Sequence, residues 1–141
     1  MFKKYAIGDT FTVGALLSVS GGFLDAYTFT ARGGVFANAQ TGNVVMFGIK
    51  LFSGDARGAL YYLIPILAFI FGIFLINFIK YHFEKNAFGD HRFLALILKL
   101  ILLVATAFMP DSLNLLANTL ISFICSLQLE AFKSFRGNAF A

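Results

Sequence analysis

Three long apolar runs constrain this chain more than any other feature of its sequence. They are residues 59–79, 93–109 and 113–132, and a helix that spans a membrane needs about 20 mostly apolar residues. The composition agrees, because 59% of the residues are hydrophobic and 13% are charged, against about 45–50% and about 25% in soluble domains. A core built from 141 residues cannot bury that much apolar surface. The runs therefore predict an all-α, polytopic transmembrane bundle with a single domain over residues 1–141.

Two further segments complete the predicted topology. Residues 11–31 are apolar but include Asp25. We expect an uncleaved first span there, because the stretch is too long, and too polar at its end, for a signal peptide. Residues 36–54 begin with a polar stretch and continue with an apolar one. Such a segment survives at membrane depth when it packs against protein or faces a wet cavity. The prediction is therefore about four spans plus a polar segment that is either re-entrant or a broken span.

The basic residues lie at the ends of the apolar runs, and the net charge is +4. A nucleic-acid-binding surface would gather them on one segment, so we exclude nucleic acid as a partner. With a cytoplasmic N-terminus and a re-entrant segment 36–54, most of them fall on the cytoplasmic side, as the positive-inside rule requires. These cytoplasmic residues are Lys3, Lys4, Lys80, Lys85, Arg92, Lys133 and Arg136.

The end of the chain echoes a stretch near its beginning. An acid-Ala-aromatic triplet at residues 25–27 leads to Arg-Gly-x-x-Phe-Ala at residues 32–37, and residues 130–132 lead to the same pattern at residues 136–141. We expect an inverted repeat, with a first copy at about residues 11–109 and the start of a second at about 113–141, because many secondary transporters have this build. Ala141 aligns with Ala37, so the second copy is expected to be cut off.

Two of the predicted helices carry polar stripes, which must face other helices or water rather than lipid. A purely structural interpretation of the stripes is helix packing through small and hydrogen-bonding residues. Asp25 is a candidate for a functional role, since an acid inside a membrane can bind a cation, carry a proton or pair with a base. Glu130 does the same or pairs with Lys133, and Lys99 either snorkels to the headgroups or pairs with one of the acids. The stripes are Gly14, Ser18, Gly21, Asp25, Thr28 and Arg32, and Asn114, Asn118, Ser122, Ser126 and Glu130.

Two motifs carry a resemblance to a known family. The first comprises residues 21–29 and 33–43, with Gly-Gly-Phe-Leu-Asp-Ala-Tyr and Asn-Ala-Gln-Thr-Gly-Asn, and the second comprises residues 128–132 and 136–141. They resemble the YoaK-like family of uncharacterised bacterial integral membrane proteins. The resemblance covers the whole chain. It implies a longer, multi-pass protein of the bacterial inner membrane, in which the second motif continues into further spans, and it brings no substrate with it.

The sequence predicts a transporter-like protein that moves a small solute or ion. Residues 40–43 would supply backbone and amide ligands, Asp25 charge or proton coupling, and Arg32 a hold on the segment or on an anion. The predicted solute site is Asp25, Arg32, Asn38, Gln40, Thr41, Asn43 and Glu130.

Other function classes stay open beside the transporter. The polar stripes fit a non-transporting interaction or scaffold protein, and the truncation fits a non-functional gene fragment. The expected partners are the lipid bilayer, a small solute or ion, and further copies of the same chain. Catalytic signatures for phosphate, metal or acyl chemistry are missing from the sequence, and its one cysteine, Cys125, excludes an intrachain disulfide. We expect no enzyme, no cofactor and no metal.

Overall fold

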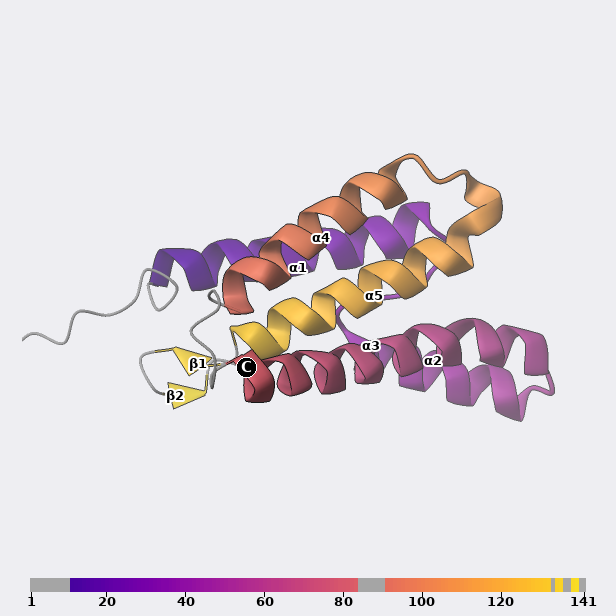
Figure 1. Ribbon diagram of the computed structural model, residues 1–141. Coiled ribbons are helices and arrows are strands. Elements are labelled where there is room, and N and C mark those ends of the chain that lie inside the picture. The colour runs from indigo at the N-terminus through magenta and orange to yellow at the C-terminus, as the bar shows by residue number, and fades with distance from the viewer. Residues whose placement is uncertain (1–10, 84–90, 133, 136–137, 140–141) are drawn as a thin grey trace, which may run out of the picture.

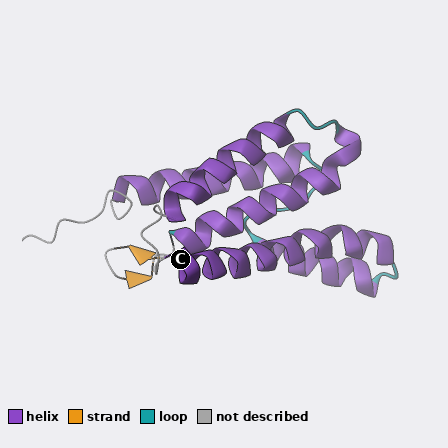
Figure 2. Ribbon diagram, in the orientation of Figure 1, coloured by secondary structure: helices purple, strands orange, loops and turns teal. Residues whose placement is uncertain are grey.

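A computed structural model describes residues 11–83, 91–132, 134–135 and 138–139 of the chain. Within them the chain is almost entirely helical (Figure 2), which confirms the predicted all-α fold. A short 3-10 turn precedes the last helix at Asp111–Leu113, and two-residue strands follow it as β1 (Ser134–Phe135) and β2 (Asn138–Ala139), paired antiparallel. The helices are α1 (Phe11–Ala31), α2 (Gln40–Phe52), α3 (Ala56–Phe83), α4 (His91–Ala107) and α5 (Asn114–Ala131).

The long helices lie side by side, and α5 lies between α3 and α4 (Figure 1). One apolar cluster joins Leu24 of α1 to Phe69 of α3 and Ile121 of α5. A second joins Ile76 of α3 and Ala95 of α4 to the end of α5. The chain is therefore built around α5, whose inward residues touch every long helix.

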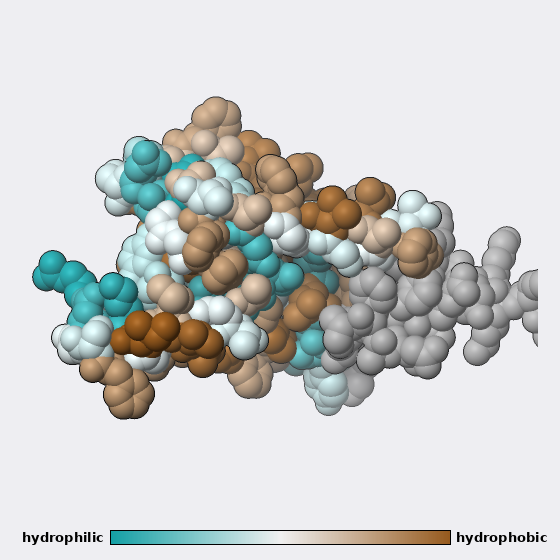
Figure 3. Space-filling model, turned by 180° about the vertical axis from the view of Figure 1, so that it is seen from behind, coloured by the Kyte–Doolittle hydropathy of each residue, from teal (hydrophilic) through white to brown (hydrophobic). Residues whose placement is uncertain are grey.

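Two helical segments are long and apolar enough to cross a membrane, Ala56–His82 and Asp111–Ala131, and Ala95–Ala107 forms a shorter apolar helix. Their outward faces carry large apolar side chains, such as Phe74, which is 70% exposed. Brown patches of such residues show on the surface in Figure 3. The helices coincide with the predicted runs, while the full set of four spans and the inverted repeat stay predictions. The Arg136-Gly137 of the second copy lies outside the described residues.

Polar side chains are found inside the bundle, on the predicted stripes. Asn118, Ser122, Ser126 and Glu130 of α5 are buried. On α1, the stripe members Gly14, Gly21 and Thr28 are buried as well, whereas Ser18 is exposed and Asp25 is half-buried. Large apolar side chains thus lie on the outside, and the interior holds these polar groups beside the two apolar clusters.

Small residues let α3 approach α5 closely. A Cβ added at Gly72 would lie 2.9 Å from the carbonyl oxygen of Phe123 and would collide with the Ser126 hydroxyl. Small residues at such contacts bring helix backbones together in membrane proteins. Gly72 therefore fixes the position of α5 against α3.

The polar segment that follows α1 turns back into the bundle. Gly33 and Gly34 have φ values of 87° and 81°, a conformation that favours glycine. Helix α2 then begins part-way along the bundle and runs to the end at which α1 stopped (Figure 1). Its 13 residues span about 20 Å at 1.5 Å per residue. The predicted segment 36–54 thus contains a half-length helix over Gln40–Phe52.

A tight turn joins α2 to α3. The Asp55 carboxylate accepts a hydrogen bond from the backbone N–H of Gly58 at 2.8 Å and forms an ion pair with Lys50 at 3.2 Å. The N–H bond caps the start of α3, where backbone donors have no helical partner. The same contacts, the Gly58 N–H first, hold the pKa of Asp55 below its usual value.

Candidate functional site

A cavity of about 260 Å³ lies between α1 and α5. Polar atoms reach it from both helices and from the chain between α1 and α2. Apolar side chains form the rest of its wall. The lining residues are Leu17, Ser18, Gly21, Asn38, Cys125, Gln128, Leu129 and Phe132.

The carboxylate of Asp25 lies on the α1 side of this region, at the start of α2. Its Oδ1 accepts hydrogen bonds from the backbone N–H groups of Asn38, at 2.6 Å, and Ala39, at 3.2 Å. These two residues immediately precede α2, whose N-terminus carries a partial positive charge. Asp25 therefore holds the beginning of the half-length helix against α1 and places Asn38 in the cavity wall.

Lys99 of α4 reaches the same region from behind Gln128. Its side chain is buried, and its Nζ donates hydrogen bonds to Ser20 Oγ at 2.7 Å and to Gln128 Oε1. The Gln128 amide in turn donates to the Leu17 carbonyl at 3.3 Å. The expected snorkelling of Lys99 is wrong, and its hydrogen-bond partners are neutral groups and not the predicted acids, because α4 turns this residue toward α1 and α5.

Two residues of the Gln-Thr-Gly-Asn motif at residues 40–43 hold the loop before α2 together. Asn43 is fully buried; its Oδ1 accepts from the Phe36 N–H at 2.9 Å, and its Nδ2 donates to the Phe36 carbonyl and to Gln40 Oε1. Gln40 Nε2 donates to the Ala37 carbonyl at 2.9 Å. Thr41 is exposed. Gln40 and Asn43 therefore shape the loop that carries Asn38.

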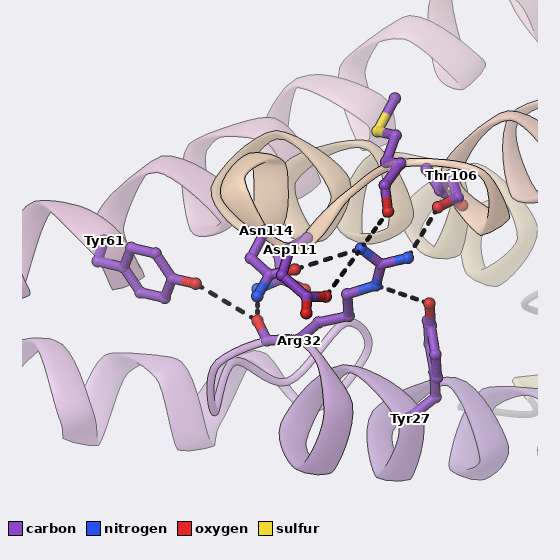
Figure 4. A network of polar contacts seen from close by, with 8 residues as sticks. Tyr27, Arg32, Tyr61, Thr106, Asp111 and Asn114 are labelled. Atoms are coloured by element: carbon purple, nitrogen blue, oxygen red, sulfur yellow. Dashed lines mark hydrogen bonds and ion pairs between the residues drawn. The ribbon is translucent and has the colours of Figure 1, made fainter.

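Arg32 lies at the end of α1, away from the cavity lining, in a network of protein acceptors (Figure 4). Its guanidinium donates to the Tyr27 hydroxyl at 2.7 Å and to the carbonyls of Met109 and Thr106 at 2.8 and 3.1 Å. Asn118 of α5 donates to the Arg32 carbonyl at 2.6 Å. Side chain and backbone of this one residue thus tie α1 to the α4–α5 connection and to α5.

Glu130 lies near the other end of α5 and pairs with α3. Its Oε1 is 3.5 Å from Lys80 Nζ, and Lys80 also donates to the Glu130 backbone carbonyl. Lys133, the partner expected from the sequence, lies outside the described residues. The ion pair with Lys80 joins the ends of two helices that pack along their whole length.

Of the predicted site residues, the structure thus places Asn38 in the cavity wall and Asp25 next to it, hydrogen-bonded to the Asn38 backbone. Gln40 and Asn43 support that wall indirectly, whereas Arg32 and Glu130 lie apart from it. Sequence reasoning missed Gln128 as a wall residue. The signal was present: a lysine inside an apolar run needs polar partners, and Gln128 offers one.

Metal ligands do not gather near these residues. Within the part of the chain that the structure describes, no group of three or more His, Cys, Asp or Glu side chains is placed to hold a metal ion. The cavity instead offers two amides, a hydroxyl and a thiol.

Comparison with known proteins identifies a family without a known activity. The model of a family described as a protein of unknown function, DUF1275, matches residues 13–141. No curated protein matches the chain, and no solved structure does. The match confirms the predicted resemblance at the level of an uncharacterised family; the YoaK-like name and the truncation stay predictions.

Proposed function

The chain belongs to the DUF1275 family, which matches residues 13–141, and from this premise we propose that it is a transporter-like, multi-pass protein of the bacterial inner membrane. In this proposal α1, α3, α4 and α5 cross the bilayer and the N-terminus is cytoplasmic. Residues 36–54 enter the membrane and leave on the same side. A small solute or ion binds in the cavity between α1 and α5.

One observation carries this proposal: a cavity with three polar side chains in an otherwise apolar wall lies where a half-length helix meets a bundle whose outside is apolar. Irregular backbone is tolerated at membrane depth when it is packed in protein or lines a cavity. Transporters place their substrate sites at such interrupted helices, because the free N–H groups and carbonyls there can bind ligands. Asn38 lines the cavity immediately before α2 begins, which fits this pattern.

Within the proposed site, Asp25 positions the chain before α2, and the Asn38 side chain binds the solute. The Asp25 carboxylate fixes the backbone at Asn38 through its 2.6 Å hydrogen bond. The Asn38 and Gln128 amides and the Ser18 hydroxyl offer both donors and acceptors to a solute. Motion of α2 would release Asn38 from Asp25, so the same contact would couple solute binding to a change in the loop.

Glycine neighbours on α1 give a matched test of the cavity. Gly21 lines it, and a Cβ there would lie 3.1 Å from Asn38 Nδ2, whereas a Cβ at Gly22 would meet nothing within 4 Å. Gly21→Leu should fill the cavity and Gly22→Leu should leave it open. Both add the same side chain to the same helix.

The measurement is solute entry into proteoliposomes, followed by light scattering as the vesicles swell in isosmotic lactamide, glycerol, or potassium lactate with valinomycin as the counter-ion path. The unsubstituted protein and Gly22→Leu should admit at least one solute faster than empty liposomes do, and Gly21→Leu should return that rate to the empty value. Equal swelling of protein-loaded and empty liposomes with every solute would refute the proposed function.

A competing function, a non-transporting interaction protein, draws on the polar contacts that stay inside the bundle. The side-chain N–H groups of Arg32, Asn43 and Asn118 donate hydrogen bonds to other parts of the protein, which is how polar residues join membrane helices. Under this function, substitutions along the α5 stripe would change the stability or assembly of the protein. The swelling assay would then show no solute entry above that of empty liposomes.

A further inference from the structure

We propose that the cavity between α1 and α5 selects a small organic anion, such as a short-chain monocarboxylate, through the buried ammonium of Lys99. This inference rests on the proposed function and names its substrate class. It follows from the charges around the cavity, from the groups in its wall, and from the position of Lys99 directly behind that wall.

In the part of the chain that the structure describes, no acid lies within ion-pair distance of Lys99. The side chain is buried, and its hydrogen bonds go to the neutral Ser20 hydroxyl and Gln128 amide. Among the described residues, no ion pair includes Lys99; those present join Arg32, Lys50 and Lys80 to acids. A buried charge without a counter-charge is costly, so an anion that arrives next to it is strongly favoured.

Asp25 makes its hydrogen bonds with α2 and not with Lys99, and the positive end of that helix partly offsets its charge. Its Oδ1 binds two backbone N–H groups at the positive end of α2. Lys99, by contrast, is hydrogen-bonded directly to the wall residue Gln128. An anion that enters beside Gln128 is therefore close to an ammonium group, and in a site of low dielectric this attraction is strong.

The cavity wall fits an anion with a short apolar part. Leu17, Leu129 and Phe132 line one portion, and the Gln128 amide lies next to the Lys99 ammonium. A carboxylate can take the place of the Gln128 oxygen as an acceptor for Lys99, or accept from the Gln128 and Asn38 amides. The aliphatic end then packs against the apolar side chains.

The one cysteine of the chain supplies the test. Cys125 lines the cavity, so its modification reports which reagents enter. Methanethiosulfonates form a mixed disulfide when the thiolate attacks the sulfenyl sulfur and methanesulfinate leaves. Three such reagents differ in charge: the anionic sulfonatoethyl, the cationic trimethylammonioethyl and the neutral methyl compound. The protein is used whole, in liposomes.

The rate at which each reagent modifies Cys125 is divided by its rate with a free thiol in solution. The normalised rate of the anionic reagent is then divided by that of the cationic reagent. This ratio cancels any change in the reactivity of the thiolate, because the same thiolate attacks both reagents. A unit charge several ångströms away should favour the anion about tenfold or more at an effective dielectric constant of about 20. Lys99→Gln should abolish the preference and Lys99→Arg should keep it. Lys50→Gln, an equal charge change at the end of α2, should leave the ratio unaltered.

A second arm uses lactate and lactamide, which share a shape and differ in charge. Lactate should slow modification by the neutral reagent at concentrations where lactamide does not, and Lys99→Gln should remove that protection. Equal protection by both, or an anion-to-cation ratio near one in the unsubstituted protein, would overturn the anion inference while leaving the cavity in place. Failure of even the neutral reagent to reach Cys125 would instead contradict the proposed function, together with the inference that rests on it.

Discussion

Replacing Arg32 by Met should destabilise the bundle more than any other single change of charge described above. The side chain is 7% exposed, and it donates to the carbonyls of Thr106 and Met109 as well as to the Tyr27 hydroxyl. Methionine has a similar length and no donor. The substitution leaves these acceptors without their partner and frees the end of α1 from the α4–α5 connection.

The size of the effect follows from these contacts. A hydrogen bond to a charged group contributes about 1.5–3 kcal/mol, and removing one partner of a buried charged network costs about 3–5 kcal/mol. The ion pair to Asp111 adds little, because it is 4.0 Å long and the acid is 92% exposed. We therefore expect Arg32→Met to lower the free energy of unfolding by about 3–5 kcal/mol. Arg32→Lys should recover only part of it, since lysine lacks the planar fork.

The assay uses the buried thiol of Cys125 as a reporter of unfolding. A polyethylene-glycol maleimide, too large for the cavity, labels the thiol only after the helices separate, and the labelled fraction is read as a gel shift across an SDS titration in mixed micelles. Arg57→Met, an exposed arginine at the start of α3, is the control and should change stability by less than about 0.5 kcal/mol. Equal unfolding midpoints for the two variants would show that Arg32 does not clamp the helices.

Two further predictions concern packing and pH. Gly72→Ala should lower the free energy of unfolding by about 1–3 kcal/mol in the same assay, because its Cβ would lie 2.9 Å from the Phe123 carbonyl. A Cβ at Gly48 meets nothing within 4 Å, so Gly48→Ala should be neutral or stabilising. Equal effects of the two substitutions would contradict the close approach of α3 and α5. Because the Gly58 N–H lowers the pKa of Asp55, this carboxylate should stabilise the α2–α3 turn above the ordinary carboxyl pKa and lose that effect as the pH falls through its lowered pKa. The pH dependence of unfolding between about pH 2 and pH 5 should therefore be shallower in Asp55→Asn, and identical curves would refute the cap.

The predicted helices agree well with the structure, because they rest on local patterns. Residues 11–31 form α1 within its predicted bounds, and the runs at 59–79, 93–109 and 113–132 lie largely within α3, α4 and α5. A helix satisfies its backbone within its own segment, so an apolar run of sufficient length is enough to indicate one. The polar stripe of α5 also faces inward as predicted, since its spacing of four residues fixes one side of a helix.

The pairing of charged residues was harder to predict, because it depends on which helices meet. The i, i+3 neighbour Lys133 is the natural partner for Glu130 along one helix, yet Lys80 reaches Glu130 from α3. Lys99 looked close enough to a membrane surface to snorkel, but its face of α4 turns toward α1 and Gln128. Neither contact can be found from spacing along a single helix.

The sequence by itself determined the all-helical build, the position of each long helix and the polar residues that had to face inward, because length, hydropathy and helical period are properties of each segment alone. Only the tertiary structure decided what those inward residues do. It assigned Arg32 to a clamp, Asn43 to a loop and Asp25 to the start of α2. It also placed Lys99 behind the cavity wall. Hydrogen bonds and fields act across space over a few ångströms, and only packing brings residues far apart in sequence to that distance.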